Sequence, residues 1–261
     1  MTYEQILTET RGRVGLLTLN QPDKLNAMSN VMNRELRKAI AAWNADDAVG
    51  AIVITGAGRG FCSGADIGRF EDVVRGDGAE TSAYPSETEW VDLVRGSKPI
   101  ICAINGVAVG LGITFTLPCD LRVAAEGARI SFRFVRIGLT PEMASTHYLT
   151  NMVGMGHALE LMLTGKFIFA DEAKRLGLVN HVYPAESLLE EAVKLGREIA
   201  DNPAWHLERV KRLVHENYME RDVGWVLRRE REIFAQAQRS DAHSEALKAF
   251  REKREPNFHR Q

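Results

Sequence analysis

Apolar residues recur along this chain with two different periods, which predicts a mixed α/β protein. Residues 14–19 and 50–55 are rich in strand-forming side chains. Between them, apolar residues recur every three or four positions from Met32 to Trp43, and Ser29 stands where a helix N-cap is expected. We therefore expect a hairpin in the first twenty residues, then a helix and a buried strand, which together make a β-α-β opening.

The alternation continues to about residue 200. A polar segment with glycine and proline at 75–86 predicts a mobile loop. Buried strands are predicted at 99–104 and 121–125, with a helix-like segment at 111–117 between them, and a last strand at 178–182. From residue 141 the pattern is mainly helical, with segments at 142–152, 157–163 and 170–176.

After Pro184 the strand signal stops. Apolar residues at 207, 210, 214 and 218 form one helical stripe, and a weaker stripe follows at 226–237. We interpret residues 1–200 as an α/β core and residues 201–261 as a helical appendage. These stripes exceed what a closed core needs, so we expect the appendage to make contacts between subunits.

The composition and net charge of the chain limit the classes of protein to which it can belong. The chain has 261 residues, of which 45% are hydrophobic and 26% charged, with a formal net charge of −2. A chain of this length can bury roughly 75% of its unfolded surface, so it needs no metal or disulfide to hold its core. The balanced charge and the lack of a long basic block argue against nucleic acid as a main partner.

The cysteines, the apolar runs and the first residues predict the cellular compartment of the protein. Cys62, Cys102 and Cys119 lie in separate segments without C-x-x-C spacing, which argues against a disulfide framework or a zinc site. No uninterrupted apolar run reaches the roughly 18 residues of a membrane span. The first residues carry an acid and no cationic flank, so we expect a cytoplasmic protein.

Two glycine-rich turns carry the candidate chemistry. The first, TGAGRGFCSGADIG at residues 55–68, follows a predicted strand, but its glycine spacing fits neither G-x-G-x-x-G nor a P-loop. The second lies within KPIICAINGVAVGLGITFTLPCD at residues 98–120. Peptide N–H groups from two such turns can form an oxyanion hole for a thioester or ester carbonyl, whereas either turn alone fits a plain structural role.

Together with LNQPDKLNAM at residues 19–28, these turns resemble the enoyl-CoA hydratase/isomerase family, the crotonase superfamily. The likeness continues through LTGKFIFADEAKRLGLVNHV at 163–182 and KAFREKREPNF at 248–258. It implies a spiral of repeated ββα units with a C-terminal helical region. It also implies acyl-CoA thioester substrates, no metal, no cofactor beyond the CoA of the substrate, and homotrimers or homohexamers.

The resemblance assigns roles to individual residues. The backbone N–H groups of Ala65 and Leu111 correspond to the two oxyanion donors, and Leu111 stands where relatives often have glycine. Ala65, Asp66 and Ile67 correspond to the segment that meets the adenine of CoA, although Asp66 also suits a role in fixing the turn. Lys253 and Phe258 correspond to tail residues that approach the CoA of a neighbouring subunit, and a solvated helix face is the plainer interpretation of that basic tail.

The reaction that the resemblance implies depends on which acidic residues the chain has at the site. The two glutamates of typical hydratases correspond here to Thr114 and Phe134, and neither can act as a base at neutral pH. Glu142, in GLTPEMAS, resembles the single acid of some Δ3,Δ2-enoyl-CoA isomerases, and we expect it in the first turn of a helix after Pro141. An acid at that place is also stabilised by the helix dipole, by about 0.3–1 kcal/mol, without any catalytic role.

We therefore expect an enoyl-CoA isomerase that uses Glu142 as its base. A hydratase using Glu142 alone and a thioesterase stay open, as does a degenerate acyl-CoA binder or RNA-associated scaffold. His147 lies five residues further on and would not share the face of Glu142. Cys62 has no base spaced to activate it and is best explained as a small apolar filler.

Overall fold

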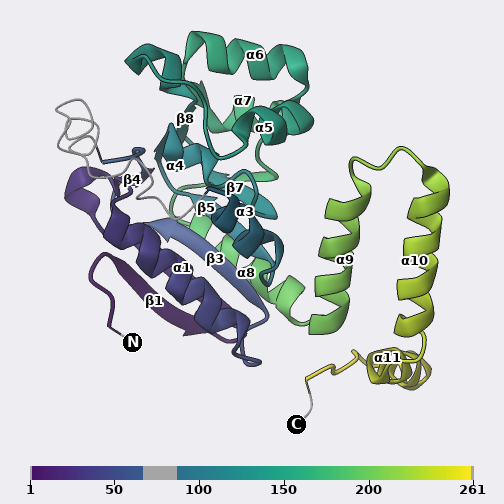
Figure 1. The fold of residues 1–261 in the computed structure, drawn as a ribbon. Coiled ribbons are helices and arrows are strands. Elements are labelled where there is room, and N and C mark those ends of the chain that lie inside the picture. The colour runs from purple at the N-terminus through teal and green to yellow at the C-terminus, as the bar shows by residue number, and fades with distance from the viewer. Residues whose placement is uncertain (1, 67–86, 260–261) are drawn as a thin grey trace.

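The computed structural model describes residues 2–66 and 87–259 (Figure 1). It begins with an antiparallel hairpin of β1 (Ile6–Arg11) and β2 (Val14–Leu19). Helix α1 (Asn30–Asn44) starts after Ser29, whose hydroxyl accepts the Met32 N–H at 3.1 Å. Strand β3 (Ala51–Gly56) then pairs in parallel with β2. The predicted β-α-β opening is confirmed.

Two sheets run through the core. The larger has the order β1-β2-β3-β5-β7-β10 and is parallel beyond the hairpin, and the smaller has the order β4-β6-β8-β9. Strands β3, β5 and β7 are each followed by a short strand of the smaller sheet, which is the repeated unit of a spiral. The further strands are β4 (Gly60–Cys62), β5 (Ile100–Ile104), β6 (Val107–Val109), β7 (Leu121–Ala125), β8 (Arg129–Ser131), β9 (Ile168–Phe169) and β10 (His181–Tyr183).

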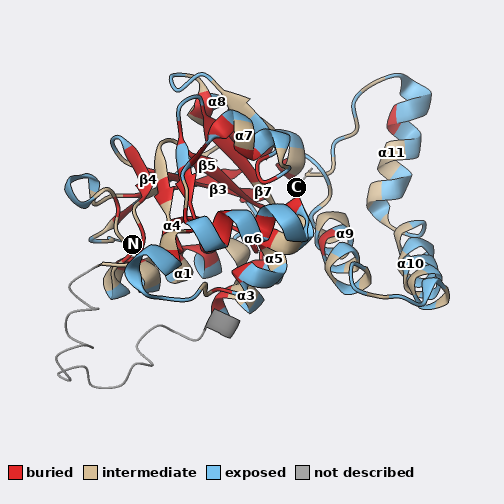
Figure 2. Cartoon of the chain, turned by 90° about the horizontal axis from the view of Figure 1, so that it is seen from above, coloured by how far each residue is buried: buried red, intermediate tan, exposed pale blue. Residues whose placement is uncertain are grey.

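Helices cover both faces of the larger sheet. A Cβ on Gly15 of β2 would overlap the ring of Trp43 in α1. The neighbouring Val14 instead faces Gly196 of α8 (Leu188–Ala200). Because successive residues of a strand point to opposite faces, α1 and α8 lie on opposite sides of the sheet. All residues of β3 and β5 are buried, as parallel strands covered on both faces require, and Figure 2 shows this buried centre.

The helical segments after the second glycine-rich turn differ from prediction at their ends. Helix α4 (Leu111–Thr114) is shorter than the predicted 111–117, and strand β10 begins three residues later than the predicted 178–182. Helix α5 (Ser145–Val153) begins after Glu142, so the prediction that Glu142 lies in its first turn is wrong. The reason is local: Met143 and Ala144 have φ values of 58° and 53°, which a right-handed helix cannot contain.

The other predicted helices are present. They are α6 (Met155–Thr164) and α7 (Ala170–Arg175). Also described are α3 (Glu87–Arg95) and two 3₁₀ turns, η1 (Pro22–Lys24) and η2 (Arg133–Ile137). The loop predicted at 75–86 lies outside the described residues. None of the helices in the described ranges is long and apolar enough to cross a membrane.

The chain ends in α9 (Ala204–Asn217), α10 (Val223–Ala237) and α11 (Asp241–Glu252), which stand beside the spiral in Figures 1 and 2. Lys211 of α9 fixes this appendage to the core. Its ammonium donates to the Val94 carbonyl oxygen at 2.7 Å, to Asp120 Oδ2 at 2.8 Å and to Ser97 Oγ at 3.4 Å. The Asp120 carboxylate also accepts the Ile100 N–H at 2.7 Å, so one buried contact joins α9 to the start of β5.

Candidate active site

The two glycine-rich turns lie directly against each other. Gly64, with φ of +115°, has no room for a side chain, because a Cβ there would lie 3.0 Å from the Val109 carbonyl oxygen. A Cβ on Gly112 would overlap the carbonyl oxygen of Cys62. Glycine at both positions therefore allows the backbones to approach closely, and the turns predicted to share one site are adjacent.

The amide of Ala65 is available at this junction. Met28 forms a parallel bridge with Ala65. The Met28 N–H donates to the Gly64 carbonyl oxygen at 2.7 Å, and the Asp66 N–H donates to the Met28 carbonyl oxygen at 3.3 Å. In such a bridge the central residue directs its own N–H and C=O away from its partner. Within the described ranges, the Ala65 N–H has no hydrogen-bond acceptor.

The amide of Leu111 is available for a different reason. Gly110 precedes α4 with φ of 54° and ψ of −122°, which turns the chain sharply into the helix. Its carbonyl oxygen accepts the N–H groups of Ile113 and Thr114, at 3.1 and 3.0 Å. The N–H of Leu111 belongs to the first turn of α4 and has no acceptor in the part of the chain that the structure describes.

Asn26 holds the first turn in place. This residue is fully buried and has φ of 55°. Its side-chain nitrogen donates to the carbonyl oxygens of Ala57 at 2.9 Å and Gly60 at 2.8 Å, and its side-chain oxygen accepts the Gln21 N–H at 2.8 Å. The segment at residues 19–28 thus supports the glycine-rich turn through one buried amide.

A hydrogen bond from Thr114 links the Glu142 carboxylate to this junction. The Thr114 hydroxyl donates to Glu142 Oε1 at 2.7 Å, across a separation of 28 residues in sequence. Thr114 is fully buried and lies one turn after Leu111 on α4, whereas Glu142 is partly buried. The structure therefore brings the carboxylate next to the helix that carries the Leu111 amide.

The backbone around Glu142 is unusual. Met143 and Ala144 both adopt the left-handed conformation, which costs of order 1–3 kcal/mol at each residue without glycine. The Glu142 carbonyl oxygen accepts the Ser145 N–H at 3.0 Å, and buried Met143 packs into the core. Strained backbone that is held by packing in this way is concentrated at functional sites.

Phe134 forms an apolar wall beside the second turn. Its side chain is buried, and its ring would lie 3.9 Å from a Cβ placed on Gly110. The Gly110 N–H donates to the Ser131 carbonyl oxygen at 2.9 Å, which fixes the turn against β8. Phe134 therefore places an apolar ring where the resemblance places a hydratase acid, and Glu142 is an acid that contacts α4.

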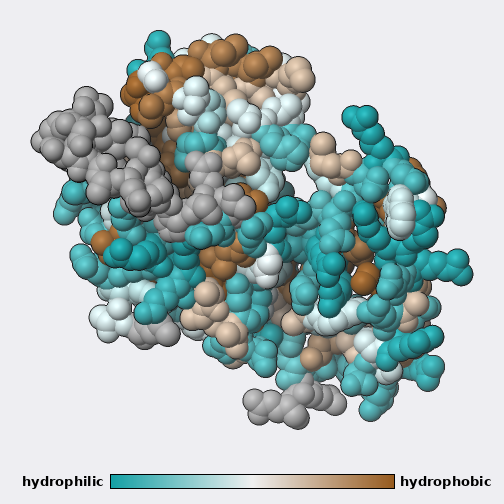
Figure 3. Space-filling view, viewed as in Figure 1, coloured by the Kyte–Doolittle hydropathy of each residue, from teal (hydrophilic) through white to brown (hydrophobic). Residues whose placement is uncertain are grey.

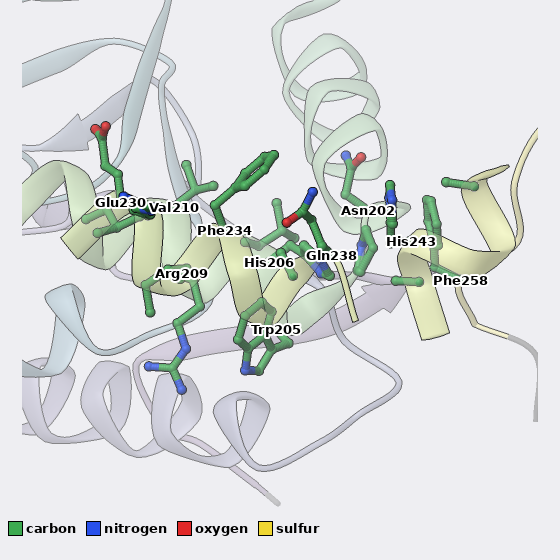
Figure 4. Close-up of a pocket in the computed structure, with 18 of the residues that line it drawn as sticks. Asn202, Trp205, His206, Arg209, Val210, Glu230, Phe234, Gln238, His243 and Phe258 are labelled. Carbon is green, nitrogen blue, oxygen red and sulfur yellow. The ribbon is translucent and has the colours of Figure 1, made fainter. Parts of the chain in front are cut away.

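The remaining predicted site residues are placed differently. Asp66 is partly buried and pairs with Lys24 at 3.4 Å, and Ile67 lies outside the described residues. Lys253 ends α11, and Phe258 lines a cavity of about 980 Å³ between α9, α10 and α11 (Figure 4). Figures 1 and 2 place α11 on the far side of the chain from β4, so within one chain the structure does not bring Lys253 and Phe258 to the glycine-rich turns.

Cys62 and His147, which the sequence analysis left out of the catalytic site, do not act as catalytic groups in the proposed function. Burial raises the pKa of the Cys62 thiol to about 12, so this side chain stays protonated and fills space beneath the turn. His147 is exposed on α5, where its ring contacts the Asn151 amide at 3.1 Å. The described part of the chain has no group of three or more His, Cys, Asp or Glu residues that could hold a metal ion.

Sequence reasoning missed the contact between Thr114 and Glu142, because it considered Thr114 only as a missing acid. The signal was a hydroxyl residue inside LGITFTL, an otherwise apolar segment. A buried hydroxyl requires a partner, but the sequence could not show that this partner is a carboxylate 28 residues away.

Comparisons with known proteins show what the whole chain is similar to. Residues 9–261 match the family described as enoyl-CoA hydratase/isomerase. The chain is 37% identical over 258 residues to a "Probable enoyl-CoA hydratase" of Rhizobium meliloti, with 99% of each chain covered. It is 32% identical over 256 residues to the "Short-chain-enoyl-CoA hydratase" of Clostridium acetobutylicum, with 97% of each covered. A solved enoyl-CoA hydratase from Polaromonas sp. JS666 superposes with a TM-score of 0.90 at 29% identity, covering 97% of this chain and 98% of that one.

Proposed function

The chain belongs to the enoyl-CoA hydratase/isomerase family, the crotonase superfamily, and on that premise we propose that it is an enoyl-CoA double-bond isomerase. The observation that carries the proposal is the placement of one acid, Glu142, through its hydrogen bond to Thr114 on α4. At the two positions where the resemblance places the hydratase acids, the chain has Thr114 itself and Phe134, both buried. One carboxylate suits a reaction that removes a proton and returns it to a nearby carbon.

In the proposed mechanism, the Ala65 and Leu111 amides bind the thioester oxygen of a 3-enoyl-CoA. Glu142 removes a proton from C2, and the electron pair moves into a dienolate whose oxygen charge the two amides stabilise. Glu142 then returns the proton at C4, and the double bond lies between C2 and C3. The CoA moiety is part of the substrate, and no separate cofactor is required.

A hydratase that uses Glu142 alone is the second candidate. The names of both relatives described above favour it, since each is called a hydratase. Water addition to a 2-enoyl-CoA would require Glu142 to deprotonate the water and then supply the proton to C2. The two candidates share the oxyanion hole and the base, and they differ in the product.

The test is to replace Glu142 by glutamine and to follow both substrates by mass spectrometry. With a 3-enoyl-CoA we expect the wild type to form the 2-enoyl isomer, and Glu142→Gln to lose about 10²–10⁴-fold in kcat while acyl-CoA still binds. Glu126→Gln is the control, because Glu126 is exposed after β7 and should keep full activity.

The outcomes separate the candidates. Faster gain of one water from a 2-enoyl-CoA would favour the hydratase, and release of free CoA would favour a thioesterase. An active Glu142→Gln variant would refute both schemes that rest on this carboxylate.

We also propose that the chain forms a homotrimer or homohexamer through residues 201–261. No residue of α10, all of which is described, is buried within the chain. In Figure 3 a few apolar side chains show between mainly hydrophilic ones in this region, and Leu227 and Phe234 of α10 line the cavity of Figure 4. The large hydrophobic residues exposed there are Val210, Val214, Tyr218, Met219, Val223, Trp225, Leu227, Phe234, Leu247 and Phe250.

A second copy of the chain is the occupant that explains these exposed residues, because a monomer rarely leaves so large an apolar surface in water. Such an assembly could also bring Lys253 and Phe258 to the CoA bound by a neighbour. That cross-subunit role is part of the proposal.

A further inference from the structure

Helix α4 carries two groups that face the same site. Leu111 and Thr114 are three residues apart, so their positions lie on one side of a helical turn. The helix itself cannot shift easily, because the close approach of Gly112 to Cys62 fixes it against the first glycine-rich turn. A side chain bound to Thr114 is therefore held at a set place relative to the Leu111 amide.

The hydroxyl of Thr114 does not take the partner that a helical threonine usually takes. Threonine in a helix commonly donates to a carbonyl oxygen three or four residues earlier. Thr116, in the turn that follows α4, donates in the same way to the Ile113 carbonyl oxygen at 2.7 Å. Thr114 instead reaches Glu142 Oε1, also at 2.7 Å, while the Gly110 carbonyl oxygen is occupied by two backbone N–H groups.

Glu142 lies on a different segment of the chain, 28 residues after Thr114, and its side chain meets α4 at the Thr114 hydroxyl. The segment bends through two left-handed residues before α5 begins. A carboxylate can accept one hydrogen bond and still have lone pairs for a proton, so the Thr114 contact orients Glu142 without removing its basicity. Because Thr114 is fully buried, water cannot readily replace this hydroxyl.

We propose that Thr114 is a positioning residue, whose hydroxyl holds the Glu142 carboxylate in register with the Leu111 amide. This inference rests on the proposed function, in which Glu142 is the base. It assigns a task to the position where the resemblance places a hydratase acid: the side chain there acts through Glu142 and does not itself exchange a proton with the substrate.

The experiment compares Thr114→Val, Thr114→Ser and Thr116→Val with the full-length wild type, using a 3-enoyl-CoA as the probe. Thr114→Val keeps the branched shape and removes the donor. We expect kcat to fall about 10²-fold with little change in KM, because misplacement of a reacting group by a fraction of an ångström to 1 Å has effects of that size. The acidic limb of the kcat/KM pH profile should move to higher pH, since a donor that favours the charged carboxylate is lost.

Two comparisons distinguish positioning from a general structural role. Thr114→Ser restores the donor and should recover most of the activity and the wild-type pH profile. Thr116→Val removes an equally buried hydroxyl from the same segment and should keep both the activity and the pH profile of the wild type. In the double variant with Glu142→Gln, adding Thr114→Val should cost no further activity, because both changes remove one function.

The results that overturn the inference are distinct from those that overturn the proposed function. If Glu142→Gln is inactive while Thr114→Val keeps the wild-type kcat and pH profile, the inference alone fails. It also fails if Thr114→Val and Thr116→Val lose activity equally with unchanged pH profiles. If Glu142→Gln is fully active, the proposed base is wrong and the inference falls with it. Circular dichroism and urea midpoints check the fold of each variant.

Discussion

Replacing Lys211 by methionine tests how the helical appendage is attached to the core. The side chain of Lys211 is 6% exposed and its ammonium contacts Asp120, Val94 and Ser97. Methionine keeps the apolar stem and removes the charge, so Asp120 and the Val94 carbonyl oxygen lose a donor. The variant therefore measures the free energy contributed by one buried contact between α9 and the core.

The magnitude follows from the surroundings of Asp120. Removing one partner of a buried ion pair typically costs about 3–5 kcal/mol. Here the Asp120 side chain stays 20% exposed and keeps the Ile100 N–H at 2.7 Å, so part of its charge remains solvated and hydrogen-bonded. We expect a loss of about 2–3 kcal/mol in the free energy of unfolding, which is about 1 M in the urea midpoint at a typical slope.

The assay is urea unfolding followed by circular dichroism and by tryptophan fluorescence, at one fixed protomer concentration because assembly would add to stability. The matched control is Arg212→Met, one residue further along α9. Arg212 pairs with Glu216 at 2.6 Å but both side chains are exposed, so this change should leave the urea midpoint close to that of the wild type. Equal urea midpoints for Lys211→Met and Arg212→Met would refute the reasoning.

Two further predictions address the oxyanion hole and the assembly. Leu111→Pro deletes a backbone N–H at a position where proline suits a helix start, so kcat should fall about 10²–10³-fold, whereas Leu111→Ala should keep much of the activity; equal losses with an intact circular dichroism spectrum would count against the backbone role. Light scattering at micromolar concentration should give a mass near three or six times 29.1 kDa, and a clean monomer would remove the basis for a cross-subunit role of Lys253 and Phe258.

The strands and the first helix could be predicted because their signals are local. Apolar runs within 50–55 and 99–104 favour strands buried in a sheet, and 121–125 is apolar apart from Arg122. Ser29 marks the start of its helix by accepting a hydrogen bond from the Met32 N–H. The short strands β4, β6, β8 and β9 were missed. They have two or three residues each, which is too short for a periodic pattern.

The candidate site was predictable only in part. The glycine-rich sequences predicted two turns. The contact between the two turns depends on parallel strands that end at the same edge of the sheet. The helix start was misplaced by three residues because Pro141 and an acid are ordinary signals for a helix N-terminus. Left-handed Met143 and Ala144 have no signature in sequence, since neither residue type favours that conformation. Met143 is held by its packing in the core, which the sequence does not show.

The order of the strands has a consequence for synthesis of the chain on the ribosome. The edge strand β10 (His181–Tyr183) pairs with β7, and α8 then packs across β2, β3, β5 and β7. Until residue 200 has emerged, the face of the larger sheet that carries Val14 and Val53 lacks α8, the helix that packs on these side chains. Nascent chains that stall or are truncated before α8 should therefore aggregate or bind chaperones, whereas those ending after residue 200 can already close the spiral.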